Sequence, residues 1–281
     1  MSRRTLLAFV VLPIFSGCFR VRPESLLPAG GAPSAAQVSE YLDGRASSFI
    51  VLGDSSSFVW PALLQDLLST HAQVGGVYRV RNAAAADARV SAWSAETEAA
   101  FRSRLASVIA AEARASVGAP LPKFVLCQVS LRGVGDSRGP VKSEHDMVGA
   151  EMGADALERL ARELRQLGVE RIVFATPPHE TGADPELGLE RVAIERLLAR
   201  GHEFIAAGPD LNAATRRYFP DAYDEDRVQL NEFGLKLVAE EWYRYLAGPE
   251  AREDVVEALY AQPYDVKAIE AAQLERSGFR P

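Results

Sequence analysis

The stretch FIVLGDS at residues 49–55 joins a run of apolar residues to a short polar turn that ends in a serine. A continuous apolar run of this length, rich in β-branched residues and followed by turn residues, predicts a strand buried on both faces. Gly53 and Asp54 favour a sharp turn after it. Ser55 would then stand just beyond the carboxyl end of the strand, which is where open parallel α/β sheets bind their ligands.

The rest of the chain alternates between strand-like and helical patterns. Short apolar runs predict strands at 48–54, 77–83, 123–130, 171–176 and 203–207. Apolar residues at spacings of three and four predict helices at 97–115, 157–167, 187–200 and 231–246, and Gly168 would stop the second of them. This alternation predicts an α/β fold with one doubly wound, mostly parallel, five-stranded sheet flanked by helices in a three-layer sandwich.

Composition and charge exclude several classes of function. The chain has 281 residues, 48% of them hydrophobic and 25% charged, as in ordinary soluble globular proteins. A net charge of -7 and the lack of any basic run argue against a nucleic-acid partner. None of the four histidines lies three or four residues from another, so no metal site is predicted. No glycine-rich phosphate loop occurs, and we expect no cofactor.

The N-terminus has the anatomy of a secretory signal. Arg3 and Arg4 precede an apolar run at 6–15, which is shorter than the roughly 20 residues needed to span a bilayer. Cys18 follows Gly17 and resembles the lipidated cysteine of a bacterial lipobox. We therefore predict a membrane-anchored lipoprotein of the bacterial cell envelope, on its periplasmic side or at its surface. The alternatives are an uncleaved anchor and an ordinary signal peptide with a chance cysteine.

The remaining boundaries follow from changes in composition. After the signal peptide at 1–18, residues 19–46 are rich in proline and glycine and predict a flexible tether. The folded domain is expected at 47–248. A helical C-terminal extension is expected at 249–281, with helical stretches at 255–260 and 266–274. Cys127 lies in an apolar run and is expected to be a small buried hydrophobe.

Two segments resemble the first and last motifs of the SGNH/GDSL esterase and lipase family. The first is the strand-end Gly-Asp-Ser at 53–55, and the last is DRVQLNEFG at 226–234, which the family writes as Asp-x-x-His-Leu-x-x-x-Gly. The resemblance implies the flavodoxin-like SGNH-hydrolase fold over the domain at 47–248. It also implies ester hydrolysis, with Ser55 as nucleophile and Asp226 as the residue that orients the base. Leu230 and Gly234 fit the motif as well.

The base position of the motif holds Gln229 in place of histidine. An amide cannot accept a proton at neutral pH, and loss of a triad base typically costs ~10³–10⁶ in rate. The two middle motifs also depart from the family. Asn82 is followed by alanines up to Ala86, without the expected glycine. The third motif aligns either on Arg132 or on Gly135, and neither alignment supplies its asparagine.

Other residues could take over parts of the site. His179 follows the fourth predicted strand and is a candidate for a relocated base, while His145, in the loop after the third strand, is a weaker one. Arg132 could bind an anion in the cleft, or pair with Asp54 or Asp226. Ser55 and the two serines after it could simply cap a helix that starts at Phe58. His71 and His202 lie near helix ends and are expected to be structural or solvated.

Two functions therefore compete. One is a divergent hydrolase of acyl or acetyl esters in a lipid or envelope glycan, using Ser55. The other is an inactive pseudo-hydrolase that binds a glycan, acyl or anionic ligand, or a protein partner, in the old cleft. We expect the cleft to involve Asp54, Asn82, Ala86, Arg132, Gly135 and Gln229.

Overall fold

Parallel strands hydrogen-bonded in the order β2-β1-β3-β4-β5 form a five-stranded sheet. The computed structural model describes residues 41–42, 47–72, 78–85, 90, 103, 105–111, 124–131, 144–178, 188–227 and 229–277. The strands are β1 (Ser47–Gly53), β2 (Tyr78–Asn82), β3 (Phe124–Gln128), β4 (Arg171–Thr176) and β5 (Ile205–Asp210). The predicted α/β fold with a parallel, doubly wound sheet is confirmed.

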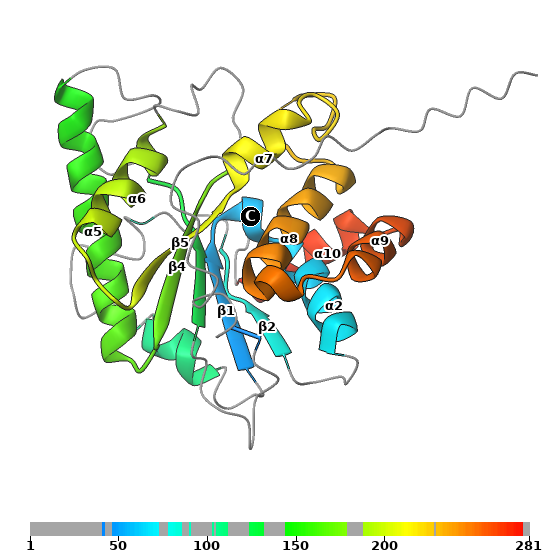
Figure 1. Ribbon diagram of the computed structural model, residues 1–281, viewed down its shortest axis with the longest axis horizontal. Helices are drawn as coiled ribbons and strands as arrows, with labels where there is room; N and C mark the ends of the chain where they lie inside the picture. The colour runs from blue at the N-terminus through cyan, green and yellow to red at the C-terminus, as the bar shows by residue number, and fades with distance from the viewer. Residues whose placement is uncertain are drawn as a thin grey trace, which may run out of the picture. The chain divides into compact units, whose positions relative to one another are not determined.

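Helices cover both faces of this sheet (Figure 1). On one face, Ile50, Val125 and Ile172 pack against α5 (Glu144–Gln166) and α6 (Leu189–Ala199). On the other face, Val51 and Leu126 pack against α2 (Trp60–Ala72), α8 (Glu232–Ala247) and α9 (Glu253–Ala261). Side chains that alternate along each strand thus bury themselves in two separate layers, as expected for a sheet covered on both sides.

The remaining elements are short. The 3-10 helix η1 (Ser55–Ser57) follows β1, and α7 (Leu211–Arg217) follows β5. The C-terminal part adds the 3-10 helix η3 (Gly248–Glu250) and α10 (Val266–Arg276). Residues 105–111, within the helix predicted at 97–115, are helical. No helix among the described residues is long and apolar enough to cross a membrane.

The strand predicted at 203–207 lies instead at Ile205–Asp210. Gly208 and Pro209 argue against a strand in the sequence, but β5 is the edge of the sheet, where a proline without an N–H is tolerated. Gly208 also allows a close approach to β4, because a Cβ added there would lie 3.0 Å from the backbone nitrogen of Ala175. Gly208 and Pro209 therefore both lie within β5.

Helix α5 begins well before the helix predicted at 157–167. His145, expected in a loop, lies in the first turn of α5, so that expectation is wrong. Since α5 connects the parallel strands β3 and β4, it runs back from the carboxyl edge of the sheet and its first turn lies toward that edge. The predicted stop is present, as Gly168 adopts a positive φ of 94° just after the helix.

Ion pairs join α5 to α6. Glu158 accepts hydrogen bonds from Arg162, Arg200 and His202, and Arg200 also pairs with Glu151. Burial by itself would raise the pKa of Glu158, but these hydrogen bonds outweigh it and lower the pKa to about 2. The carboxylate is therefore held in its charged form by the fold.

The C-terminal extension packs against α2 and α8, a position that the sequence does not predict. Lys236 of α8, only 6% exposed, donates from Nζ to the carbonyl oxygen of Gln262 at 2.7 Å and pairs with Glu232 at 2.7 Å. Glu232 in turn accepts a hydrogen bond from the backbone of Tyr264 at 3.2 Å. The segment between α9 and α10 is thereby attached to α8.

A second attachment joins α2, α8 and the start of α9. The hydroxyl of Tyr243 accepts the backbone N–H of Arg252 at 2.9 Å and lies 2.9 Å from Nδ1 of His71. The hydroxyl can either donate its proton to Nδ1 or accept a second hydrogen bond from it, and a neutral imidazole permits both. Burial, and next the charge of Arg252, hold the pKa of His71 below its usual value, in agreement with this arrangement.

Two tryptophans lie at the centre of the α2–α8 interface. Trp60 and Trp242 stack with ring centroids 5.5 Å apart and planes inclined by 12°, and both are fully buried. Within the described part of the chain, no group accepts a hydrogen bond from either indole N–H. Their contact is therefore one of aromatic packing and apolar burial alone.

Candidate functional site

The turn after β1 is held by Gly53 and Asp54. A Cβ added to Gly53 would lie 2.2 Å from Oγ of Ser57, so only glycine lets the 3-10 turn fold back onto the strand. Asp54 caps this turn, because its Oδ1 accepts from the backbone N–H of Ser56 at 2.9 Å and from the Ser56 hydroxyl at 2.6 Å. Asp54, which we expected in the cleft, thus has a structural task.

Ser55 lies at the carboxyl end of β1, as predicted, and is exposed. Among the described residues its hydroxyl makes no hydrogen bond. The neighbouring hydroxyl of Ser56, by contrast, accepts from Nε2 of Gln128 at 2.9 Å. Gln128 is buried at the end of β3, and none of the residues that the structure describes bonds to its Oε1. Sequence reasoning overlooked both residues, although Gln128 is a polar residue that ends an apolar run.

The serines do not cap a helix that starts at Phe58. They form η1 themselves, Asp54 is the capping residue, and α2 begins only at Trp60. The simple capping interpretation of Ser55 is therefore wrong in its details, and the exposed hydroxyl is left without a structural task in the described part of the chain.

Asn82 is committed to the scaffold. Its Nδ2 donates to the carbonyl oxygens of Ser57 at 2.8 Å and Phe58 at 3.0 Å, and its Oδ1 accepts from the backbone of Ala84 at 3.0 Å. These bonds fasten the end of β2 to the turn that carries Ser55. The side chain thus shapes the rim, and its hydrogen-bonding groups are already used.

The last motif forms a separate loop before α8. Oδ1 of Asp226 accepts the backbone N–H of Gln229 at 3.2 Å, and both side chains are exposed. Within the described residues, no hydrogen bond joins either of them to Ser55. Asn231 caps α8 by accepting from the backbone of Gly234 at 3.0 Å, and a Cβ on Gly234 would lie 2.1 Å from a backbone oxygen. These two residues have structural roles.

Several predicted site residues lie outside the described part of the chain, namely Cys18, Ala86, Arg132, Gly135 and His179. Two histidines make structural contacts, as expected. Nδ1 of His71 contacts the hydroxyl of Tyr243, and Nε2 of His202 lies 2.8 Å from a carboxylate oxygen of Glu158. Asp210, at the end of β5, accepts from the Thr176 hydroxyl at 2.9 Å, pairs with Arg191 and caps α7. No group of three potential metal ligands occurs among the described residues.

Comparison with known proteins shows likeness in structure but not in sequence. No protein-family model matches the chain, and no curated protein matches it. A gut microbial diltiazem-metabolizing enzyme is similar in structure, with a TM-score of 0.52 and 14% identity over 72% of this chain. The chain spans 47% of that protein's length.

Two further solved structures are similar at a lower level. TesA has a TM-score of 0.44 and 18% identity over 76% of this chain and 99% of its own. An acetyl xylan esterase has a TM-score of 0.44 and 16% identity over 69% of this chain and 96% of its own. The sheet, its strand order and the strand-end Gly-Asp-Ser turn define an α/β protein with an SGNH/GDSL-hydrolase-like fold. The likeness to solved structures shows the fold alone.

Proposed function

We propose that this protein is a pseudo-hydrolase that binds a polar ligand, such as the hydroxyl face of an envelope glycan, at the rim around Ser55 and Gln229. The proposal is supported by the sequence, in which Gln229 occupies the motif position of the catalytic histidine, and by the hydrogen bond from its backbone N–H to Oδ1 of Asp226. An amide donates and accepts hydrogen bonds without transferring a proton. Together with the Ser55 hydroxyl it suits neutral hydroxyl and carbonyl groups.

The other described polar groups near Ser55 support binding over catalysis. Asp54 caps the turn through Oδ1, and Asn82 is an amide whose polar atoms bond to the scaffold and cannot act as a base. His71 and His202 are held by other partners. A serine hydroxyl without an adjacent base is a weak nucleophile and a good hydrogen-bonding group.

A divergent ester hydrolase is the second candidate. It is favoured by the exposed Ser55 hydroxyl and by the first turn of α5, which brings the backbone of His145 toward the same edge of the sheet. His179, which follows β4 in the sequence, is the other candidate base. In this version Ser55 attacks an acyl or acetyl ester while one of these histidines takes its proton and returns it to the leaving alcohol as the ester C–O bond breaks. Water then hydrolyses the acyl-serine and releases the acid.

Hydrolysis of p-nitrophenyl acetate, measured beside calorimetric titration with a neutral oligosaccharide such as chitotetraose, separates the two candidates. For a pseudo-hydrolase, the wild-type protein and Ser55→Ala hydrolyse the ester at equal rates, and Gln229→Ala weakens oligosaccharide binding. A rate that drops at least a hundredfold in Ser55→Ala would establish the hydrolase and refute our proposal.

We also propose that lipidated Cys18 anchors the protein in the bacterial cell envelope, and that a tether separates the domain from the membrane. The tether predicted at 19–46 is too long at its C-terminal end, because Tyr41 and Leu42 are buried in the core of the domain. The support is the signal-like sequence before Cys18. Cys18→Ala is expected to move the protein from the membrane fraction to the soluble fraction of the envelope. Unchanged fractionation would contradict lipid anchoring through this residue.

A further inference from the structure

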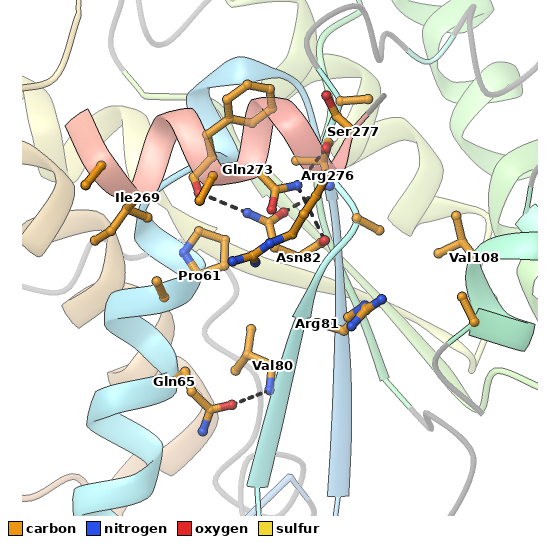
Figure 2. A pocket seen from close by; sticks show the side chains of 18 of the residues that line it. Pro61, Gln65, Val80, Arg81, Asn82, Val108, Ile269, Gln273, Arg276 and Ser277 are labelled. Atoms are coloured by element: carbon orange, nitrogen blue, oxygen red, sulfur yellow. Dashed lines mark hydrogen bonds between the residues drawn. The ribbon is translucent and has the colours of Figure 1, made fainter. Parts of the chain in front are cut away.

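A cavity of about 870 Å³ lies along the outer edge of β2, and neither Ser55 nor Gln229 is among its described lining residues (Figure 2). Its described walls come from α2, β2 and the residues after it, residues 105–111 and α10. Many of the lining side chains are small, including Ala62, Ala83, Ala84, Ala85, Ala268 and Ala272. The cavity therefore gives access to the backbone at the edge of the sheet.

Strand β2 turns alternate backbone groups toward this cavity. The N–H groups of Ala83 and Ala85 donate to the carbonyl oxygens of Val51, at 2.9 Å, and Gly53, at 3.0 Å. Odd-numbered residues thus pair with β1, and the even-numbered residues Val80 and Asn82 present their backbone groups at the free edge. An edge of this kind is a template for another strand unless something covers it.

Glutamine side chains cover part of this edge. Gln65 of α2 donates from Nε2 to the carbonyl of Tyr78 at 3.1 Å and accepts the Val80 N–H through Oε1 at 2.7 Å. Gln273 of α10 donates from Nε2 to the carbonyl of Ala84 at 3.0 Å (Figure 2). The edge is therefore closed at both ends by side-chain amides that imitate a peptide group.

The groups between the two glutamines are open. The Val80 carbonyl and the Asn82 N–H have no partner among the described residues, while the Asn82 carbonyl lies 3.5 Å from Nε2 of Gln273. Oε1 of Gln273, on a side chain only 3% exposed, also lacks a partner. The cavity is thus lined by residues with three open hydrogen-bonding groups. These are the Val80 carbonyl and Oε1 of Gln273, which are acceptors, and the Asn82 N–H, which is a donor.

The two open backbone groups fit one residue of a parallel strand. In a parallel ladder, one residue donates its N–H to the carbonyl of residue i−1 and accepts from the N–H of residue i+1. Val80 and Asn82 are residues i−1 and i+1 about Arg81. In an antiparallel pair the same two groups would bond to two different residues of the added strand, so the direction of the strand follows from the charge beside it.

Charge in the cavity favours one end of such a strand. Figure 2 shows the Arg276 side chain extending from α10 over the cavity toward Asn82, and Arg276 lines the cavity. The guanidinium has no ion-pair partner among the described residues. A parallel peptide would point its C-terminus toward the carboxyl edge of the sheet, where α10 crosses. A guanidinium there suits a terminal carboxylate, which it can bind with two hydrogen bonds.

We propose that this cavity binds an extended peptide with a free C-terminal carboxylate, added to the sheet as a short parallel strand beside β2. One peptide residue pairs with the Val80 carbonyl and the Asn82 N–H, and the carboxylate pairs with Arg276. Backbone hydrogen bonds give affinity in this mode of recognition, and the small residues of the cavity wall leave room for the peptide. The site is independent of the function proposed for Ser55.

The probe is a fluorescein-labelled hexapeptide of alternating alanine and valine with a free C-terminal carboxylate, and its binding is followed by fluorescence anisotropy. We expect Arg276→Ala, and amidation of the peptide C-terminus, each to weaken binding at least tenfold, with Arg276→Lys partly restoring it. Ala268→Trp, which fills the cavity from its exposed wall, should abolish binding. Both positions are exposed, so melting curves should show that the variants fold.

Two measurements test the strand geometry itself. In a series of peptides methylated on one amide nitrogen each, a single position should abolish binding, because only one N–H meets Val80. Amide exchange of Asn82, measured by NMR, should slow at least tenfold when the peptide is bound. Unchanged exchange at Asn82, or equal binding of all methylated peptides, would overturn the proposal. So would displacement of the peptide by laurate without protection of Asn82, since this would indicate an acyl-chain site.

Discussion

Replacement of Gln229 by histidine should convert the binding rim into an esterase. The backbone N–H of residue 229 bonds to Oδ1 of Asp226 at 3.2 Å, and this contact does not depend on the side chain. The new imidazole would therefore stand beside the carboxylate that orients it. A positioned general base contributes ~10²–10⁴ in rate, equivalent to ~3–5 kcal/mol of barrier. We expect p-nitrophenyl acetate hydrolysis to rise at least a hundredfold.

The assay compares Gln229→His with wild type, with Gln229→Asn and with the double variant that also carries Ser55→Ala. Because Gln229 is exposed, all should melt within a few degrees of wild type, in keeping with the roughly 0.5 kcal/mol typical of surface changes. The gain should be absent from the asparagine and double variants. A correctly folded Gln229→His protein with no gain would refute the reasoning, since the rim would then lack more than its base.

Three further outcomes concern stability. Gly53→Ala should destabilise the fold by ~1–3 kcal/mol in urea unfolding, because its Cβ would overlap the 3-10 turn; an unchanged midpoint would contradict this. Glu158→Gln should cost ~1–2 kcal/mol at pH 7 by removing the partner of Arg200, after allowance for solvent screening. The cost should fade as pH drops from about 4.5 to about 2, where the wild-type carboxylate is protonated; a cost that persists at pH 2 would exclude an ionic origin. The folded state lowers the pKa of His71, so the wild type should lose stability as pH falls below roughly 6.5. Melting curves of His71→Asn should show a smaller loss over that range, and Tyr243→Phe a lower midpoint throughout.

The sheet was predictable from sequence because each strand is a short apolar run buried on both faces. The run at 49–52 and its partners in β3 and β4 lie within a residue or two of the predicted bounds. Prediction was less accurate where tertiary contacts override local preference. Pro209 lies in an edge strand, and α5 extends across residues with a weak apolar pattern.

The candidate site was predictable only in part. Ser55 could be placed at the carboxyl edge because the alternation of strands and helices predicts parallel strands and the turn residues are distinctive. The Ser56–Gln128 hydrogen bond could not, since it joins residues far apart in the sequence. Nor could the packing of α10 on β2, because α10 has no strong apolar face and its contact there is made by the amide of Gln273.

The stacked indoles of Trp60 and Trp242 also give the α2–α8 interface an optical signature. Two chromophores stacked in nearly parallel planes at 5.5 Å couple their electronic transitions and should produce a paired band of opposite signs in the circular dichroism of the aromatic residues. The band depends on their mutual orientation and vanishes once the helices separate. Since α9 and α10 pack on the same layer, its amplitude would report whether this half of the molecule opens before the sheet unfolds.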